Sequence, residues 1–171
     1  MTPKFHFKLV EAKHRSLVHN WLKEPHVASW FYGQGLENTF RHLDEFIQGL
    51  SLSQYWIAYE STLPFAFFIT SSISESDNLL RQWSIKGGAI TLDMLIGDTN
   101  YLGKGLSSPL IKQFLLSQFS QVTNVLIDPE ATNLRAIHVY KKVGFTILGE
   151  FIPSHSPNPH YMMHLNMKEL L

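Results

Sequence analysis

The chain has 171 residues, a length that suits one domain with a single well-covered hydrophobic core over residues 1–171. The 14 Lys and Arg residues balance the 14 Asp and Glu residues, so no bulk charge favours nucleic acid or a membrane surface. The absence of cysteine excludes disulfides, thiolate metal sites and cysteine nucleophiles. No apolar run reaches the roughly eighteen residues of a membrane span. Because residues 1–7 also lack the apolar core of a signal peptide, we expect a soluble, cytoplasmic protein.

Hydrophobic periodicity predicts the elements of the first half of the chain. In chain order these are a strand over 5–10, helices over 14–23, 25–32 and 39–49, and two strands over 54–60 and 65–73 that a hairpin turn joins. We expect Asn38 or Thr39 to cap the third helix and Gly49 to lie near its end.

The second half alternates strands with helices. Residues 74–88 are polar and end in glycine, which predicts a loop with Trp83 embedded in it. Residues 89–96 are apolar apart from Thr91 and Asp93 and are typical of a central strand. The remaining elements are a helix over 104–119, a strand over 124–127, a helix over 133–142, and strands over 145–151 and 161–167. This order predicts an α+β fold with a sheet of mixed direction.

The segment 100–107, with the sequence Asn-Tyr-Leu-Gly-Lys-Gly-Leu-Ser, links the expected central strand to the next helix. A strand, a glycine turn and a helix N-terminus together can bind a pyrophosphate. The glycines let the backbone approach closely, and the first N–H groups of the helix point at the anion. The alternative is that Gly103 and Gly105 serve only to make the turn.

Several strings extend this motif into a family pattern. Gly103-Lys104-Gly105 fits the Gly-x-Gly part of a (Gln/Arg)-x-x-Gly-x-(Gly/Ala) motif, with Asn100 where Gln or Arg is usual. The other strings are Leu102-Gly103-Lys104-Gly105-Leu106, Asp128-Pro129, Asn133-Leu134-Arg135-Ala136-Ile137, Tyr140 followed by Gly144-Phe145, and, near the N-terminus, Asn20-Trp21-Leu22, His26-Val27 and Trp30. With these strings the chain resembles the GNAT superfamily of acyl-CoA N-acyltransferases. Within it, the chain is most similar to the bacterial aminoglycoside 6'-N-acetyltransferases.

The resemblance implies a central, mostly antiparallel twisted sheet that is splayed at the acyl-CoA site and flanked by helices. It implies acetyl-CoA as donor, coenzyme A as product, and a small-molecule amine as acceptor. The cofactor would contact the main chain of Leu102, Gly103, Lys104, Gly105, Leu106 and Ser107 at the pyrophosphate, with Lys104 a surface lysine near the anion rather than a specific ligand. The main chain of Met94, Leu95 and Ile96 would bind the thioester carbonyl and the pantetheine arm. Their broken alternation is typical of a bulge, and a plain core strand is the alternative.

Asp93 is the candidate general base. A carboxylate in the middle of an apolar strand is costly unless it is paired or lines a cleft, so a quiet ion pair with an Arg or His is the alternative. Asp93 lies ten residues before Gly103, as the general base of the aminoglycoside enzymes does relative to this loop. The resemblance therefore implies that Asp93 accepts the ammonium proton, directly or through water, and holds the substrate.

Asn133 and Tyr140 are seven residues apart on one expected helix, which places them on one face about 10 Å apart along the axis. By resemblance, Asn133 contacts the pantetheine arm and Tyr140 is the general acid for the coenzyme A thiolate. The alternative for Tyr140 is an aromatic packing residue.

Carboxylates and aromatic faces are the expected complement of a polycationic acceptor. The candidates for the acceptor site are Trp30, Phe31, Trp83, Asp128 and Glu130, and core or rim packing is the alternative for each aromatic ring. The segment 63–73 is more apolar than the corresponding strand of the family, which suggests a less polar acceptor. The nine histidines are scattered, so we expect no metal site.

These observations predict an acetyl-CoA-dependent N-acetyltransferase, a monomer or homodimer that acts on an aminoglycoside-like amine by direct transfer in a ternary complex. One alternative keeps acetyl-CoA and changes the acceptor to a siderophore precursor or a protein N-terminus. The other alternative, from a different class, is a non-catalytic acyl-CoA-binding module.

Overall fold

The computed structural model describes residues 2–171, and a seven-stranded sheet runs through their centre. The strands are β1 (Phe5–Leu9), β2 (Gln54–Glu60), β3 (Leu63–Ile73), β4 (Ala89–Ile96), β5 (Asn124–Ile127), β6 (Thr146–Phe151) and β7 (His160–Asn166). Their order in the sheet is β1-β2-β3-β4-β5-β7-β6. Every neighbouring pair is antiparallel except β4 and β5, which are parallel. The expected mixed, mostly antiparallel sheet is thus confirmed.

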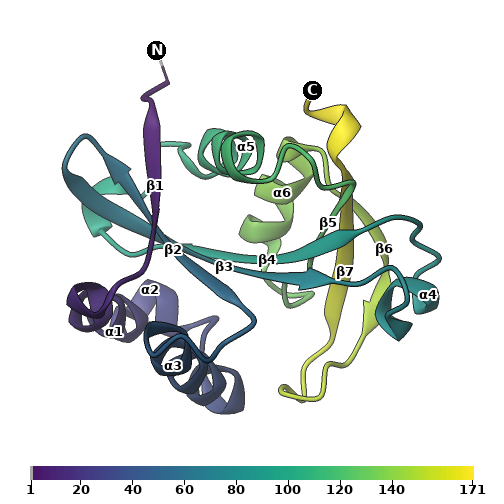
Figure 1. Ribbon diagram of the computed structural model, residues 1–171, viewed down its shortest axis with the longest axis horizontal. Helices are drawn as coiled ribbons and strands as arrows, with labels where there is room; N and C mark the ends of the chain where they lie inside the picture. The colour runs from purple at the N-terminus through teal and green to yellow at the C-terminus, as the bar shows by residue number, and fades with distance from the viewer. Residues whose placement is uncertain (1) are drawn as a thin grey trace.

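Helices cover both faces of the sheet, as Figure 1 shows: α1, α2 and α3 lie on one side, and α5 and α6 lie on the other. The helices are α1 (Arg15–Lys23), α2 (Pro25–Ala28), α3 (Gly33–Ile47), α4 (Asn78–Gln82), α5 (Ser107–Gln118) and α6 (Leu134–Val143). Side chains alternate between the two faces of a strand. In β2, Trp56 therefore lies in the core between the sheet and α5 and α6, and Ile57 lies in the core between the sheet and α1–α3. No helix within residues 2–171 combines the length and the hydrophobicity needed to cross a bilayer.

Helix α3 begins earlier than the sequence predicts. Its N-cap is Tyr32, with an extended φ of −150°, and not Asn38 or Thr39. The hydroxyl of Thr39 instead donates to the carbonyl of Gly35 inside the helix, at 2.9 Å. The two glycines of the first turn carry no apolar side chain, so the helical periodicity became visible only after them. The expected end is confirmed, because Gly49 follows the last turn with a φ of +78°.

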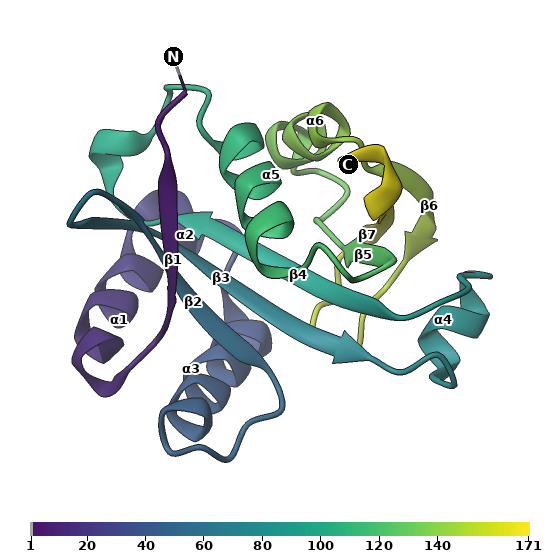
Figure 2. The ribbon, with the colours of Figure 1, turned by 45° about the horizontal axis from the view of Figure 1, so that its top comes forward.

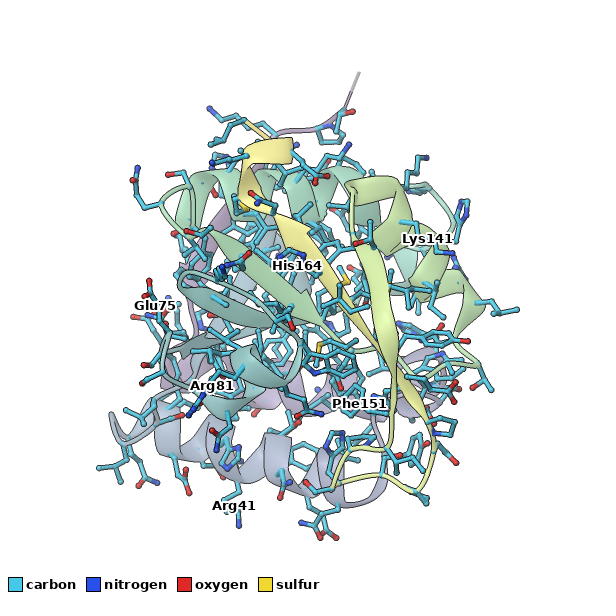
Figure 3. All side chains as sticks on the ribbon, turned by 90° about the vertical axis from the view of Figure 1, so that its right-hand side faces the viewer. Arg41, Glu75, Arg81, Lys141, Phe151 and His164 are labelled. Carbon is cyan, nitrogen blue, oxygen red and sulfur yellow. The ribbon has the colours of Figure 1, made fainter. Side chains whose placement is uncertain are left out.

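The segment 74–88 is not only a loop, because it contains the short helix α4. The carboxylate of Asp77 accepts from the N–H of Leu79 at 2.8 Å and caps this helix. Trp83 follows α4 and packs against β6, with its ring 5.9 Å from that of Phe151. Figure 3 shows Arg81 of α4 and Phe151 of β6 on the same side of the molecule.

The feature that creates the site is the separation of β4 from β5. These strands pair only from Ala89 with Asn124 to Thr91 with Leu126, and the edge of β4 beyond Thr91 has no partner on that side. The pairing of β4 with β3 continues to Ile96 without a shift of register, so the bulge expected at residues 94–96 is wrong. The strands diverge instead, and Figure 2 shows α5 and α6 side by side above β4 and β5.

Asn124 anchors the point from which the two strands diverge. Its side chain is buried, and its Nδ2 donates to the carbonyl of Lys86 at 2.8 Å. Its Oδ1 lies 2.7 Å from Nε2 of His164, which Figure 3 labels on β7. A single amide therefore ties the entry to β4 to two other strands.

Gly97, directly after β4, lies against the ring of Trp21, and this contact can be tested by its effect on stability. A Cβ atom at this position would lie 2.1 Å from the ring of Trp21, which is buried on α1. Because the indole cannot move out of a packed core, we expect Gly97→Ala to lower the free energy of unfolding by about 1–3 kcal/mol or more. The measurement is urea unfolding, with Gly88→Ala as the control, since nothing lies within 4 Å of a Cβ there. Equal stability of the two variants would contradict the packing argument.

Candidate active site

A cleft of about 730 Å³ opens where β4 and β5 separate. It is lined by β4, the turn before α5, the helix α6, the end of β5, the segment between α2 and α3, and the loop between β6 and β7. The residues of the sequence hypothesis that line it are Trp30, Phe31, Asp93, Met94, Leu95, Ile96, Leu102, Gly103, Lys104, Gly105, Leu106, Ser107, Asp128, Glu130, Asn133 and Tyr140.

The turn before α5 presents a row of free main-chain donors. Gly103 and Gly105 have φ values of +70° and +67°, and nothing lies within 4 Å of a Cβ at either position. The left-handed backbone, rather than a lack of space, therefore requires glycine here. Helix α5 begins at Ser107, three residues later than expected, and no side chain caps it. Within residues 2–171, the N–H groups from Gly103 to Ser108 have no hydrogen-bonded acceptor, an arrangement that suits a bound anion.

The unpaired edge of β4 offers further main-chain groups. The N–H of Gly97 donates to Phe65 on β3 at 2.8 Å. Since successive backbone groups of a strand point to opposite sides, the N–H groups of Met94 and Ile96 face the gap beside β5. His26 of α2 reaches the same gap, and its Nε2 lies 2.7 Å from the carbonyl oxygen of Ile96.

Asp93 points into the cleft at this gap. Its side chain is accessible from the cleft, although protein surrounds it on most sides. This enclosure, together with the charge of Asp128, raises the pKa of the Asp93 carboxyl above its ordinary value, and His160 opposes the shift. No ion pair within residues 2–171 involves Asp93, so the fold does not provide the quiet ion pair that was the alternative.

Tyr140 approaches the same space from α6. It is 8% exposed, packs 6.0 Å from the ring of Phe145, and lines the cleft. Burial and the nearby charge of Asp93 raise the pKa of the Tyr140 hydroxyl, so it keeps its proton at neutral pH. Because β5 has moved away from β4, Asp93 and Tyr140 can share one cleft from opposite sides of the sheet.

Asn133 is the N-cap of α6 and does not lie within the helix. Its Oδ1 accepts from the N–H of Ala136 at 3.2 Å, which leaves the amide nitrogen available to the cleft. The expected helix therefore starts one residue later than predicted, and Asn133 and Tyr140 still line the same cleft.

Carboxylates and a histidine form the other end of the cleft. Nδ1 of His160 lies 2.7 Å from the carbonyl oxygen and 3.1 Å from Oδ2 of Asp128. Burial lowers the pKa of His160, but the hydrogen bonds and charge of Asp128 outweigh it, and the net shift is upward. His160, when protonated, therefore forms an ion pair with Asp128, while Asp93 and Glu130 make no ion pair within residues 2–171.

Two sequence expectations about the acceptor end do not fit the structure. Trp83 does not line the cleft, because its ring packs against Gly149, where a Cβ would lie only 2.8 Å away. The apolar segment 63–73 does not line the cleft either. Phe65, Phe67 and Phe68 are buried in the two cores, so this segment carries no information about the polarity of the acceptor.

Several residues that the fold brings to the cleft were not expected from the sequence. These are His26, Tyr32, His155 and His160, and Asn158 is hydrogen-bonded to Tyr32 beside them. From the sequence, the histidines were considered as metal ligands, and His26 also as part of a family string, but none was expected in the cleft. The available signal for the others was the polar character of the loop before β7. Within residues 2–171, no three His, Asp or Glu side chains are grouped so that they could hold a metal ion.

Comparison with known proteins identifies the family to which a chain with this site is similar. A family model described as an acetyltransferase (GNAT) domain matches residues 11–152. The crystal structure of the aminoglycoside N(6')-acetyltransferase from Legionella pneumophila is 45% identical in sequence, with a TM-score of 0.91 over 99% of this chain and 96% of that chain. The aminoglycoside N(6')-acetyltransferase type 1 of Klebsiella pneumoniae is 28% identical over 144 residues, which is 76% of this chain and 68% of that protein.

A more distant structure agrees in fold. AAC(6')-Ib in complex with coenzyme A and kanamycin is 20% identical and has a TM-score of 0.76 over 96% of each chain. The family match begins in the turn before α1, ends just after β6 and includes most of the cleft-lining segments. On this evidence the chain belongs to the GNAT family of acetyltransferases.

Proposed function

We propose that the chain is an acetyl-CoA-dependent N-acetyltransferase that transfers an acetyl group to a primary amine of an aminoglycoside-like acceptor, directly within a ternary complex. The observation that carries the proposal is that the free N–H groups of residues 103–108 and the carboxylate of Asp93 open into one cleft. In this proposal, residues 1–171 form one GNAT domain that acts in the cytoplasm as a monomer or homodimer.

The donor fits the end of the cleft at α5. The N–H groups from Gly103 to Ser108 can bind a pyrophosphate, and Nζ of Lys104, 5.8 Å from the ring centre of Tyr101, adds positive charge nearby. Acetyl-CoA supplies an activated acyl carbon at the end of a long flexible arm. Along the path of this arm, the N–H groups of Met94 and Ile96 would donate to the thioester carbonyl and the amides of the arm.

The catalytic groups of the proposal are Asp93 and Tyr140. The acceptor amine must lose a proton to become nucleophilic, and Asp93 accepts it, directly or through water. The departing thiolate needs a proton, and the neutral hydroxyl of Tyr140 supplies it. The presence of both ionisable groups in one cleft favours catalysis over a non-catalytic binding module.

The acceptor end favours a cationic small molecule. Asp93, Asp128 and Glu130 place three carboxylates along the cleft, and Trp30, 42% exposed, offers an aromatic face beside them. The similarity to aminoglycoside N(6')-acetyltransferases supports the same class of acceptor. A siderophore precursor or a protein N-terminus is the second candidate, and an assay of several amines with acetyl-CoA distinguishes these possibilities.

The anion-binding turn can be tested by substitution of one glycine. We expect Gly105→Ala to raise the Kd for coenzyme A about tenfold, since a Cβ disfavours the left-handed backbone by roughly 1–2 kcal/mol. Isothermal titration calorimetry measures this change. Gly49→Ala is the matched control, because Gly49 has a similar φ of +78° with nothing within 4 Å, and it does not line the cleft. An unchanged Kd for Gly105→Ala would show that the turn does not bind the cofactor.

The role of Asp93 as the base can be tested by removing its charge. Asp93→Asn should lower kcat by about 100-fold or more at pH 7, because general base catalysis contributes that much. Only the ionised carboxylate accepts a proton, so wild-type activity should fall as the pH drops through the raised pKa of Asp93. This limb of the pH–rate profile should be absent in the variant. Thiol release measured from pH 5 to 9 tests both points, and unchanged turnover would assign the base elsewhere.

The role of Tyr140 as the acid can be tested by removing its hydroxyl. Tyr140→Phe removes the hydroxyl and keeps the ring packed against Phe145, so folding should be preserved. We expect kcat to fall by about 100-fold or more, with little change in the Kd for coenzyme A. Steady-state kinetics and calorimetry on the same preparation provide the comparison. If kcat stays at the wild-type value, water protonates the thiolate instead.

A further inference from the structure

Three residues from distant parts of the chain meet at the acceptor end of the cleft. The Tyr32 hydroxyl donates to Oε1 of Glu130 at 2.6 Å. Nδ2 of Asn158 donates to the same Oε1 at 2.7 Å and to the oxygen of Tyr32 at 2.7 Å. We refer to Tyr32, Glu130 and Asn158 as the Glu130 clasp. It joins the start of α3, the segment after β5 and the loop between β6 and β7, and in Figure 1 this loop runs down beside α3.

The carboxylate at the centre of the clasp lacks a counter-charge. Glu130 is 9% exposed, yet within residues 2–171 no Lys, Arg or His nitrogen forms an ion pair with it. Both donors of the clasp use Oε1, and Oε2 has no hydrogen-bond donor within that range. The charge of Glu130 contributes to the raised pKa of His160, but the hydrogen bonds of the His160 ring go to Asp128 and not to Glu130. An enclosed carboxylate in this state gains most from a cation that a ligand brings.

The clasp also fixes the direction of this carboxylate. Two donors on one oxygen restrict rotation of the Glu130 side chain and leave the second oxygen for the cleft, which all of Tyr32, Glu130 and His160 line. Asp93, at the gap beside β4, is a separate carboxylate in the same cleft. The cleft therefore has one anionic group for the reacting amine and another, held apart from it, for a different cation.

We infer that Glu130 binds a second ammonium group of the acceptor, distinct from the amine that is acetylated, and that Tyr32 and Asn158 are positioning residues that hold it. This inference rests on the proposed function and narrows its substrate class to amines with at least two amino groups. A charge-assisted hydrogen bond to a partly desolvated carboxylate discriminates between an ammonium and a hydroxyl at the same place.

The test compares two acceptors that share the reacting ring. Kanamycin A carries further amino groups, and methyl 6-amino-6-deoxyglucoside carries only the amine to be acetylated. Glu130→Gln removes the charge and keeps an oxygen that can accept from Tyr32 and Asn158, so the clasp should persist. We expect its kcat/KM for kanamycin A to fall at least tenfold, mainly through KM, and at least fivefold more than its kcat/KM for the monoamine.

A control and a second variant make the result specific. Glu150→Gln removes the same charge from the exposed face of β6, outside the cleft, and should alter neither acceptor. Tyr32→Phe keeps the carboxylate and removes one donor, so we expect a smaller loss in the same direction, again in KM. Thermal unfolding of each variant reports whether the fold is intact.

The possible outcomes separate the inference from the proposed function. Equal losses on both acceptors, or no loss on kanamycin A, would overturn the role of Glu130 while leaving the N-acetyltransferase in place. If the wild-type protein releases no coenzyme A with either acceptor, the proposed acceptor class is wrong and the inference falls with it.

Discussion

The structure depends on the separation of β4 from β5 after three paired residues. Asn124 holds the paired end with hydrogen bonds to the backbone before β4 and to His164 on β7. Beyond Thr91, the edge of β4 has main-chain groups but no neighbouring strand. An unpaired buried edge is costly in a protein core, so such an edge is stable only where a ligand or solvent reaches it. The cleft exists because this sheet leaves its hydrogen bonding incomplete at one place.

The separation also explains how groups from both faces of the sheet act together. In a continuous sheet, Asp93 would face the side of α1–α3 and Tyr140 would remain on the side of α6. With β5 displaced, the two side chains share one cleft, and the charge of Asp93 contributes to the raised pKa of Tyr140. The catalytic pair of the proposal is therefore a consequence of topology as much as of residue type.

Charge is distributed unevenly along the cleft although the chain is neutral overall. The end at α5 presents main-chain donors and Lys104, while the end at the β6–β7 loop presents Asp128 and Glu130. In the proposed function, an anionic donor and a cationic acceptor would each be attracted to a different end, and their reactive groups would meet beside Asp93. The net charge of zero gives no reason to expect a partner that binds through overall charge, such as nucleic acid. It does not show this local separation of charge within the cleft.

Local pattern was enough for much of the fold. Alternation predicted the strands, helical spacing predicted α1, α5 and α6, and the expected mixed sheet is confirmed. The errors have local causes as well. Gly33 and Gly35 lack side chains that would reveal the helical pattern at the start of α3. Helix α4, with five residues, is too short to show a helical periodicity. The prediction of a bulge was wrong, because the broken alternation of apolar and polar residues in β4 comes from exposure to a cleft and not from a shift of register.

By itself, the sequence determined the family, the glycine turn and the candidates Asp93, Asn133 and Tyr140, because these occupy short segments at characteristic spacings. Only the tertiary structure decided which aromatic and polar residues reach the acceptor end. It excluded Trp83, which packs on Gly149, and it assembled Tyr32, Glu130 and Asn158 from three segments far apart in the chain. Contacts between distant segments depend on how loops are placed by the sheet and helices, and no local pattern in a single sequence encodes that placement.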